Sequence, residues 1–254
     1  MVPLVLLPGL GNTAQLFDFM KPHFGHHKIN HINLISEDIQ NFDGMLAHVR
    51  QQLLAGSVKQ PNGFFEVPDG QFDMLGFSMG GYVALALALA GDLPIRRLIL
   101  VNSRAVDDNV EERAARARTL KLLDNPKTRF EGMTPGLFKS LVGPAFRQDA
   151  AMYALVRHMA QVVGRRGLAA QIRANQTRPN MVEDLAGIKQ KTLIVGGTCD
   201  RITPPDQAQR LHAGIQGSKL HIFEGCGHLS PLERPDELAA LIIDFVTDFI
   251  GSDG

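Results

Sequence analysis

The seven residues Leu75–Gly81, LGFSMGG, place one hydroxyl among apolar and glycine residues. The apolar run Phe72–Phe77 leads into Ser78 and is typical of a buried strand. The Ala/Leu-rich run Tyr82–Ala90 follows and predicts a helix that is apolar on most faces. One glycine stands two residues before the serine and another stands two residues after it. Because glycine lets backbones come close together, this stretch predicts a tight strand-to-helix turn with Ser78 at its tip.

The composition indicates one large hydrophobic core. The 254 residues are 44% hydrophobic, and 26 basic residues balance 26 acidic ones, which argues against a nucleic-acid-binding protein. The chain has two cysteines, Cys199 and Cys226, which argues against a disulfide scaffold. The apolar N-terminal stretch is short and lacks a basic segment, and no apolar run is long enough to span a bilayer. We therefore expect a cytoplasmic protein with no signal peptide and no membrane span.

Strands and helices are expected to alternate in both halves of the chain. The expected strands are Val2–Leu7, Ile29–Ile35, Phe72–Phe77, Arg97–Val101, Thr192–Val195 and Lys219–Phe223. The expected helices are one after Asn12 or Thr13, Phe42–Leu54, Ser78–Ala90, one from about Pro205, and Pro235–Ile250. The stretch Thr203–Asp206 resembles a capping box for the fourth helix. Residues 56–71 are predicted as a loop whose Phe64 and Phe65 pack against the protein. This alternation predicts an α/β fold, a mostly parallel sheet with helices on both faces.

The alternation stops in the middle of the chain. Residues 104–180 are Arg-rich and predict helices near 108–123, 149–163 and 166–175. Between Arg104 and Pro179 there are 14 basic and 7 acidic residues, against 12 basic and 19 acidic residues in the remainder. We therefore expect residues 104–185 to form a basic helical lid, inserted into a core made of residues 1–103 and 186–254.

The residues 76–80 match the pattern G-x-S-x-G in the strand-then-helix context that a nucleophile elbow requires. Such a turn lifts the hydroxyl of Ser78 above the carboxyl edge of the sheet, where the helix N-terminus faces the reacting centre. A serine hydroxyl is a weak nucleophile unless a neighbouring base removes its proton. Ser78 is accordingly the candidate nucleophile, and a plain Gly/Ser turn is the alternative.

The base and its carboxylate are expected further along the chain. His228 lies in a glycine-rich loop after the last expected strand and before the final helix, which suits the general base. Asp200 follows the strand Thr192–Val195 and would accept the Nδ1 proton of His228. Asp107 and Asp108, after the preceding strand, are rivals for this role. The order Ser78, Asp200, His228 is the one expected for this elbow.

Two backbone N–H groups are expected to meet the negative charge that develops on the substrate oxygen. One belongs to Met79, directly after the candidate nucleophile. The other is expected from the loop Pro8–Gly11 after the first strand, at Leu10. The alternative is that this loop is only a turn that ends the strand.

Four stretches together resemble the α/β-hydrolase superfamily: LLPGLG, GFSMGG, GGTCDRITPP and GCGHLSPLERP. The resemblance covers nearly the whole chain except residues 104–180. Within the superfamily, the chain is similar to the small serine carboxylesterases, including the pimeloyl-ester hydrolase type. It implies an acyl-enzyme mechanism that needs no metal and no organic cofactor. Two departures from the usual pattern are Pro8-Gly9 in place of His-Gly and a missing N-terminal β-hairpin, so the sheet should be shorter at one edge. Ser78 argues against the dehalogenase and epoxide hydrolase members, which carry aspartate at the elbow.

The expected partner is a small-molecule acyl substrate bound under the lid. Met152, Leu155 and Met159 form part of an apolar helical stripe that either lines the substrate pocket or packs in the core. The basic lid either attracts an anionic substrate or simply docks on the acidic body. In the sequence, Cys199 and Cys226 lie close to Asp200 and His228, respectively. Their thiols are either neighbours in the fold or simply two small side chains packed in the interior.

Three functions fit these residues. The leading one is a serine hydrolase that cleaves an ester, thioester or related acyl bond. A lyase that uses the same three side chains to abstract a proton is the second. A ligand receptor with slow hydrolase activity is the third, since a fold alone does not fix function.

Overall fold

The central sheet is parallel throughout. The computed structural model describes residues 2–54 and 70–247, and within them six strands pair in the order β2-β1-β3-β4-β5-β6. The strands are β1 (Leu4–Leu7), β2 (Ile29–His31), β3 (Phe72–Phe77), β4 (Ile95–Val101), β5 (Lys191–Gly197) and β6 (Lys219–Phe223). Every pairing of neighbours is parallel, so the carboxyl ends of all strands lie at one edge of the sheet. The loops that follow the strands therefore meet at that edge, and no antiparallel hairpin precedes β1 in the described residues.

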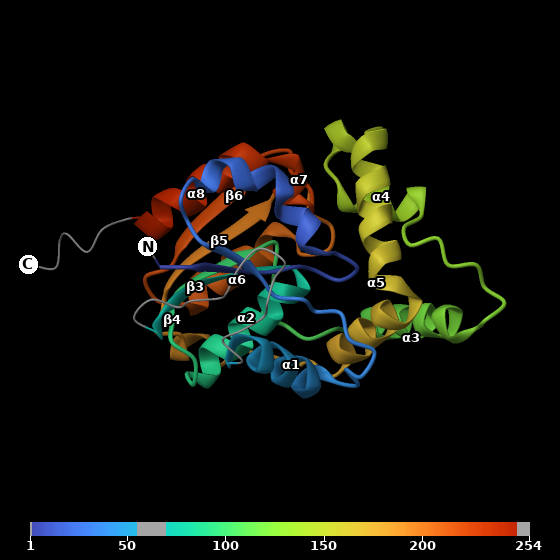
Figure 1. Ribbon diagram of the computed structural model, residues 1–254, viewed down its shortest axis with the longest axis horizontal. Helices are drawn as coiled ribbons and strands as arrows, with labels where there is room; N and C mark the ends of the chain where they lie inside the picture. The colour runs from blue at the N-terminus through green and yellow to red at the C-terminus, as the bar shows by residue number, and fades with distance from the viewer. Residues whose placement is uncertain (1, 55–69, 248–254) are drawn as a thin grey trace, which may run out of the picture.

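Helices cover both faces of the sheet, as the sequence predicted (Figure 1). One face carries α1 (Phe42–Leu54), α2 (Met79–Ala90) and α6 (Pro205–Gly214). The other carries the 3₁₀ helix η1 (Ala14–Phe24), α7 (Ser230–Glu233) and α8 (Pro235–Thr247). Successive strand side chains point to opposite faces, so Leu4 and Leu6 join one hydrophobic core and Val5 and Leu7 join the other.

Three helices interrupt the alternation between β4 and β5 and form the right end of the molecule in Figure 1. They are α3 (Val110–Asp124), α4 (Pro135–Leu141) and α5 (Ala150–Gln176). The two helices predicted near 149–163 and 166–175 correspond to the two parts of α5, which are separated by a break at Gly164, where a φ of 74° suits glycine. No helix in the described ranges is long and apolar enough to cross a membrane.

Three local predictions differ from the structure. The second strand ends at His31 instead of Ile35. The capping box at Thr203–Asp206 is wrong, because Thr203 donates its hydroxyl to Asp200 and α6 begins after Pro204 without a side-chain cap. The helix α4 was not predicted. The predictions for Phe64, Phe65 and residues 248–250 lie outside the described residues.

The imidazole of His31, at the end of β2, is largely enclosed. It stacks on Phe17 with ring centroids 6.0 Å apart, and its Nδ1 is buried with no hydrogen-bond partner in the described part of the chain. Burial, followed by the nearby Lys21 ammonium, lowers the pKa of His31 from 6.5 to about 4. The neutral ring is therefore the form that the fold accommodates.

We expect the free energy of unfolding to fall as the pH drops from 6.5 toward 4. In this window the unfolded chain binds a proton at His31 that the folded chain resists, so acid favours unfolding. His31→Gln should flatten that part of the stability curve by about 1–2 kcal/mol, since the ring is partly exposed and part of the shift is screened. Urea unfolding across this pH range measures the effect, with the exposed His158→Gln as control. Equal pH dependence in the wild type and His31→Gln would contradict it.

Candidate active site

Ser78 sits at the tip of a strained turn between β3 and α2. Its φ of 49° and ψ of −114° are uncommon for a residue with a side chain, and its N–H donates to the Val101 carbonyl at 2.9 Å. The turn is possible because a Cβ on Gly80 would lie 2.3 Å from the Leu7 carbonyl oxygen, and one on Gly76 would lie 2.4 Å from the Gly80 oxygen. Both positions exclude any larger residue, and the turn raises the Ser78 hydroxyl at the carboxyl edge of the sheet.

The structure brings together the three side chains that the sequence singled out. The Ser78 Oγ lies 2.9 Å from His228 Nε2, and His228 Nδ1 lies 2.8 Å from Asp200 Oδ2. All three residues are buried. The rival carboxylates lie elsewhere, since Asp107 pairs with Arg113 and Asp108 is surrounded by arginines. The arrangement is a continuous hydrogen-bonded path from a hydroxyl through an imidazole to a carboxylate.

The carboxylate of Asp200 is held by five hydrogen bonds. Its Oδ1 accepts the backbone N–H groups of Ile202 and Thr203 at 2.8 and 2.9 Å. Its Oδ2 accepts from the Thr203 hydroxyl at 2.7 Å, from Asn102 Nδ2 at 2.9 Å and from the imidazole. Burial alone would raise the pKa of Asp200, but His228 and the Thr203 hydrogen bonds outweigh it and leave the pKa below its usual value. Asp200 is therefore an ionised, immobilised acceptor.

Comparison with known proteins now identifies the family. A sequence model of the alpha/beta hydrolase family matches residues 4–241. The chain belongs to the alpha/beta hydrolase family. A 68-residue stretch is 46% identical to the 2-hydroxy-6-oxononadienedioate/2-hydroxy-6-oxononatrienedioate hydrolase of Escherichia coli (strain K12 / DH10B). That match covers 27% of this chain and 24% of the relative, so it spans about a quarter of the curated protein.

Solved structures of other alpha/beta hydrolases share the overall arrangement of this chain. MenH from S. aureus aligns with a TM-score of 0.80 at 23% identity, over 97% of this chain and 94% of that one. A thermophilic esterase from Thermogutta terrifontis aligns with a TM-score of 0.79 at 21% identity, over 98% and 90% of the two chains. At this level of identity the likeness supports the fold alone.

Asn102, directly after β4, is a site residue that the sequence did not reveal. Its side chain donates to Asp200 Oδ2 and to the Gly227 carbonyl at 3.2 Å, and it accepts the Ser230 hydroxyl at 2.5 Å. Its φ of 46° is left-handed, a conformation that asparagine tolerates better than most residues. Asn102 thus joins the loops that carry the carboxylate and the imidazole of this alpha/beta hydrolase. In the sequence, its position directly after an expected strand was the feature that could have marked Asn102 as a site residue.

Glu233 fixes the loop that carries the imidazole. One buried carboxylate oxygen accepts the N–H groups of Gly227 and Gly143 at 2.8 and 2.9 Å, and the other accepts that of Leu229 at 3.0 Å. The N–H of His228 itself donates to the Leu141 carbonyl at 2.6 Å. Burial raises the pKa of Glu233 despite these three N–H donors. The segment after α4 is therefore fastened to both sides of the imidazole.

The two candidate oxyanion donors come from different segments, Met79 from the start of α2 and Leu10 from the loop after β1. The loop that carries Leu10 is held by α5, because Gln171 Oε1 accepts the Gly11 N–H at 2.9 Å and its Nε2 donates to the Leu34 carbonyl at 3.1 Å. In the described residues, no hydrogen bond occupies the backbone N–H of Leu10 or of Met79. In the described part of the chain, neither N–H group therefore has an acceptor within the protein.

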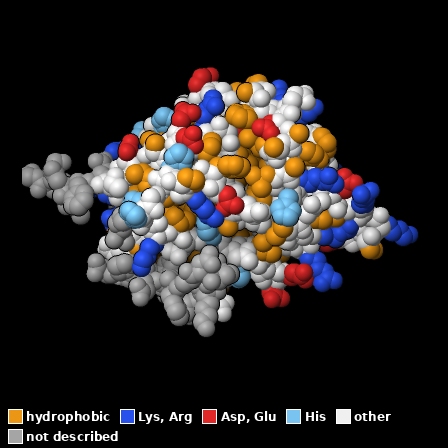
Figure 2. All heavy atoms as spheres, turned by 45° about the horizontal axis from the view of Figure 1, so that its top comes forward, with side chains coloured by type: hydrophobic (Ala, Val, Ile, Leu, Met, Phe, Trp, Pro, Cys, Tyr) orange, Lys and Arg blue, Asp and Glu red, His pale blue; other side chains and the backbone are white. Residues whose placement is uncertain are grey.

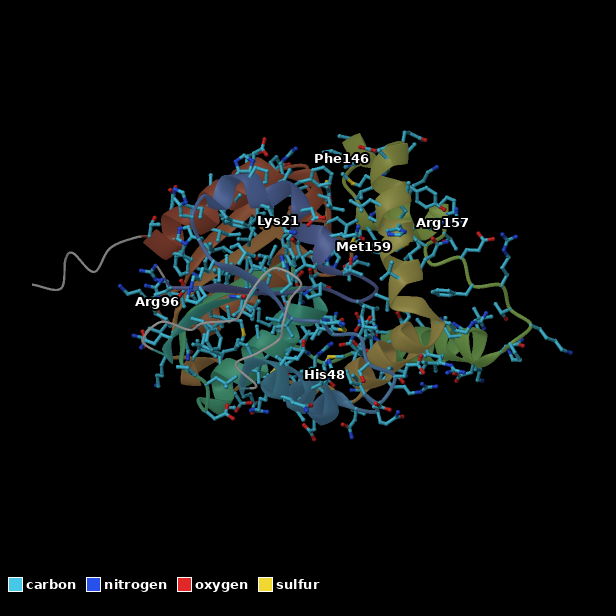
Figure 3. All side chains as sticks on the ribbon, in the orientation of Figure 1. Lys21, His48, Arg96, Phe146, Arg157 and Met159 are labelled. Atoms are coloured by element: carbon cyan, nitrogen blue, oxygen red, sulfur yellow. The ribbon has the colours of Figure 1, made fainter. Side chains whose placement is uncertain are left out.

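The apolar stripe of α5 faces the sheet. Met159 is fully buried, and Figure 3 shows it on the side of α5 toward the sheet while Arg157 lies on the opposite side. Met152 and Leu155 are partly buried against the same hydrophobic cluster, which also contains Phe77, the neighbour of Ser78. Met159 is therefore part of the core, and the other two lie at its margin. Figure 2 shows hydrophobic side chains gathered over the middle and right of one face, with Lys and Arg toward the right end.

The two cysteine-bearing loops meet behind the imidazole. The Cys199 N–H donates to the Cys226 carbonyl at 2.8 Å, and both thiols are free. Burial raises the pKa of Cys226, which makes its thiolate unfavourable. Within residues 2–54 and 70–247, no group of three or more His, Cys, Asp or Glu side chains is placed to hold a metal ion.

We expect Asn102→Ala to destabilise the protein by about 2–4 kcal/mol, because it strands a buried hydroxyl and places alanine at a left-handed φ. It should also lower turnover of any Ser78-dependent substrate, since Asp200 loses one of its donors. Chemical denaturation and steady-state kinetics measure the two effects. The exposed Asn180→Ala is the control. An unfolding free energy for Asn102→Ala within 0.5 kcal/mol of the wild type, as is usual for surface substitutions, would sink the assignment.

Proposed function

We propose that this alpha/beta hydrolase is a serine hydrolase that cleaves an ester, thioester or related acyl bond of a small molecule. The observation that carries the proposal is the path from the Ser78 Oγ through His228 to Asp200, with heavy-atom distances of 2.9 and 2.8 Å. Those distances lie within the reach required between a nucleophile, its base and the group that orients the base. The buried, ionised Asp200 supports the assignment, because it fixes the tautomer that leaves Nε2 facing the hydroxyl.

In the proposed reaction, Ser78 attacks the acyl carbon while His228 Nε2 accepts the hydroxyl proton. The imidazolium that forms is stabilised by Asp200 and then gives its proton to the departing alcohol, thiol or amine. The acyl group remains on Ser78 until a water molecule, activated by the neutral imidazole, attacks it. Hydrolysis releases the acid and restores the serine hydroxyl, so atoms and protons balance without any further reactant.

The N–H groups of Met79 and Leu10 are proposed to bind the substrate oxygen as it becomes an oxyanion. Met79 is the first residue of α2, so its N–H also lies at the positive end of the helix dipole. Removal of one such donor typically costs about a hundredfold to a thousandfold in turnover. The contact between Gln171 and the Gly11 N–H supports this role, since it fixes the orientation of the loop that carries Leu10.

A second candidate reaction is hydrolysis of a carbon–carbon bond next to a ketone. The relative from Escherichia coli is named as a hydrolase of 2-hydroxy-6-oxo dicarboxylic acids, and such compounds contain no ester. The 46% identity over 68 residues is the observation that favours this candidate. The same three side chains would serve, with the leaving group a carbon that takes a proton instead of an oxygen.

We expect Ser78→Ala to abolish hydrolysis of short p-nitrophenyl esters. Asp200→Asn should lower kcat by roughly 10⁴-fold, because the amide favours the wrong tautomer of His228. Both variants should remain folded by circular dichroism, and Ser36→Ala, which alters a serine outside the hydrogen-bonded path, should match the wild type.

Three outcomes would separate the rival functions. Ester hydrolysis that survives in Ser78→Ala would refute the nucleophile. Elimination products without a burst of acyl-enzyme would indicate a lyase. Cleavage of 6-oxo dicarboxylic acids with no activity on any ester would favour the second candidate.

A further inference from the structure

A cluster of buried arginines lies beside the proposed nucleophile. Asp108, after β4, accepts hydrogen bonds on Oδ1 from Arg104 at 2.9 Å and from Arg178 at 3.3 Å. Arg116 donates to both oxygens of the same carboxylate. Arg104 also reaches Glu112, with 2.6 Å between Nη1 and Oε1. Three guanidinium groups thus converge on two carboxylates, and the cluster retains one positive charge.

Several polar atoms of this cluster lack partners. Nε and Nη1 of Arg178 and Nε of Arg104 are buried and have no hydrogen-bond partner among the described residues. The side chain of Arg178 has no exposed surface, and that of Arg104 is 8% exposed. Buried donors left unpaired cost about 1–3 kcal/mol each, so a protein seldom retains several together without a use for them.

The net positive charge of the cluster also favours an anionic ligand. Burial lowers the pKa of Arg178. Tyr82 and Asp108 offset part of this effect, and the charges of Arg104 and Arg116 lower the pKa further. Asp107 and Arg113 pair with one another at the edge of the cluster, so they add no net charge. A ligand with one negative charge would neutralise the cluster and supply acceptors for the free N–H groups.

The cluster adjoins the nucleophile turn. Tyr82 lies one helical turn after Ser78, and its N–H approaches the Ser78 carbonyl at 3.3 Å. The Arg178 guanidinium carbon lies 3.9 Å from the centroid of the Tyr82 ring. Helical side chains lean toward the N-terminus, so the Tyr82 ring leans toward the elbow. Arg104 follows Ser103, whose hydroxyl donates to the Ser78 carbonyl at 3.1 Å.

We propose that Arg178 and Arg104 bind a carboxylate group of the substrate whose acyl carbon Ser78 attacks. The substrate class is then a monoester, thioester or ketone of a dicarboxylic acid, with a short chain between the bond that is cut and the free carboxylate. This inference rests on the proposed function, because it concerns the same bound molecule. Binding by buried arginines differs from attraction of an anionic substrate by the exposed basic residues of α3–α5. Salt screens a buried guanidinium far less than an exposed one, so the two can be told apart.

The test compares two series of methyl esters, which differ in whether the far end of the chain is a charged carboxylate or a neutral carboxamide. One series holds the monomethyl esters of succinate, glutarate and adipate, and the other holds the same esters with the free carboxylate replaced by a carboxamide. The wild type should prefer the carboxylate by at least about tenfold in kcat/KM at one chain length, and raising the salt to 0.5 M should leave that ratio within about twofold. In Arg178→Met the ratio should fall below about threefold, because the loss in kcat/KM falls mainly on the carboxylate ester. Arg113→Met, which removes a partner of the Asp108 carbonyl, should keep the wild-type ratio.

A wild-type ratio near one at every chain length would overturn the proposal, and so would an unchanged ratio in Arg178→Met. If Arg178→Met does not fold, inhibition of the wild type provides the second measurement: glutaramate should compete with the carboxamide ester at a concentration at least about tenfold below that of glutaramide. Equal inhibition by the two would count against it. Hydrolysis of the carboxamide ester that depends on Ser78 but shows no carboxylate preference refutes this inference and leaves the proposed function standing. Absence of all Ser78-dependent hydrolysis refutes the proposed function instead.

Discussion

The close approach of three backbone segments beneath Ser78 is the constraint on which the rest of the site depends. β1, β3 and the start of α2 come within contact distance of one another, and glycines at 76 and 80 are the residues that permit it. A Cβ on Gly81 would in turn lie 2.3 Å from the Ser103 hydroxyl. The strained φ of Ser78 is held by this packing. The same approach brings the end of β1, at Leu7 and Pro8, against Gly80 of the elbow.

The helices between β4 and β5 are joined to both halves of the site through hydrogen bonds. The last residue of α4, Leu141, accepts the His228 N–H, and Gly143 after it shares the carboxylate of Glu233 with the imidazole loop. The second half of α5 holds the loop before η1 through Gln171. A shift of these helices would therefore alter the base and the oxyanion loop together. In this alpha/beta hydrolase, the helical segment is therefore hydrogen-bonded to two loops of the candidate active site.

Sequence reasoning found what short-range patterns encode. The strand β3, the helix α1 and the turn at Ser78 follow from apolar periodicity and glycine spacing, which act within a few residues. The side chains of Asp200 and His228 followed from the elbow pattern and chain order. The contacts of Asn102, Gln171 and Glu233 depend on partners between 4 and 160 residues away, and no local pattern marks them. The capping box at Thr203 failed for a related reason, because a tertiary partner, Asp200, took the hydroxyl.

The measurement that tests the central claim most directly is covalent labelling with a fluorophosphonate, followed by intact-mass and peptide mass spectrometry. Activated serines react with such probes because their hydroxyl loses its proton to a neighbouring base. The account predicts one added phosphonyl group per chain, located on the peptide that contains Ser78, and no labelling in His228→Ala or in heat-unfolded protein. Labelling at another residue, or equal labelling of Ser78 when the imidazole of His228 is removed, would contradict it.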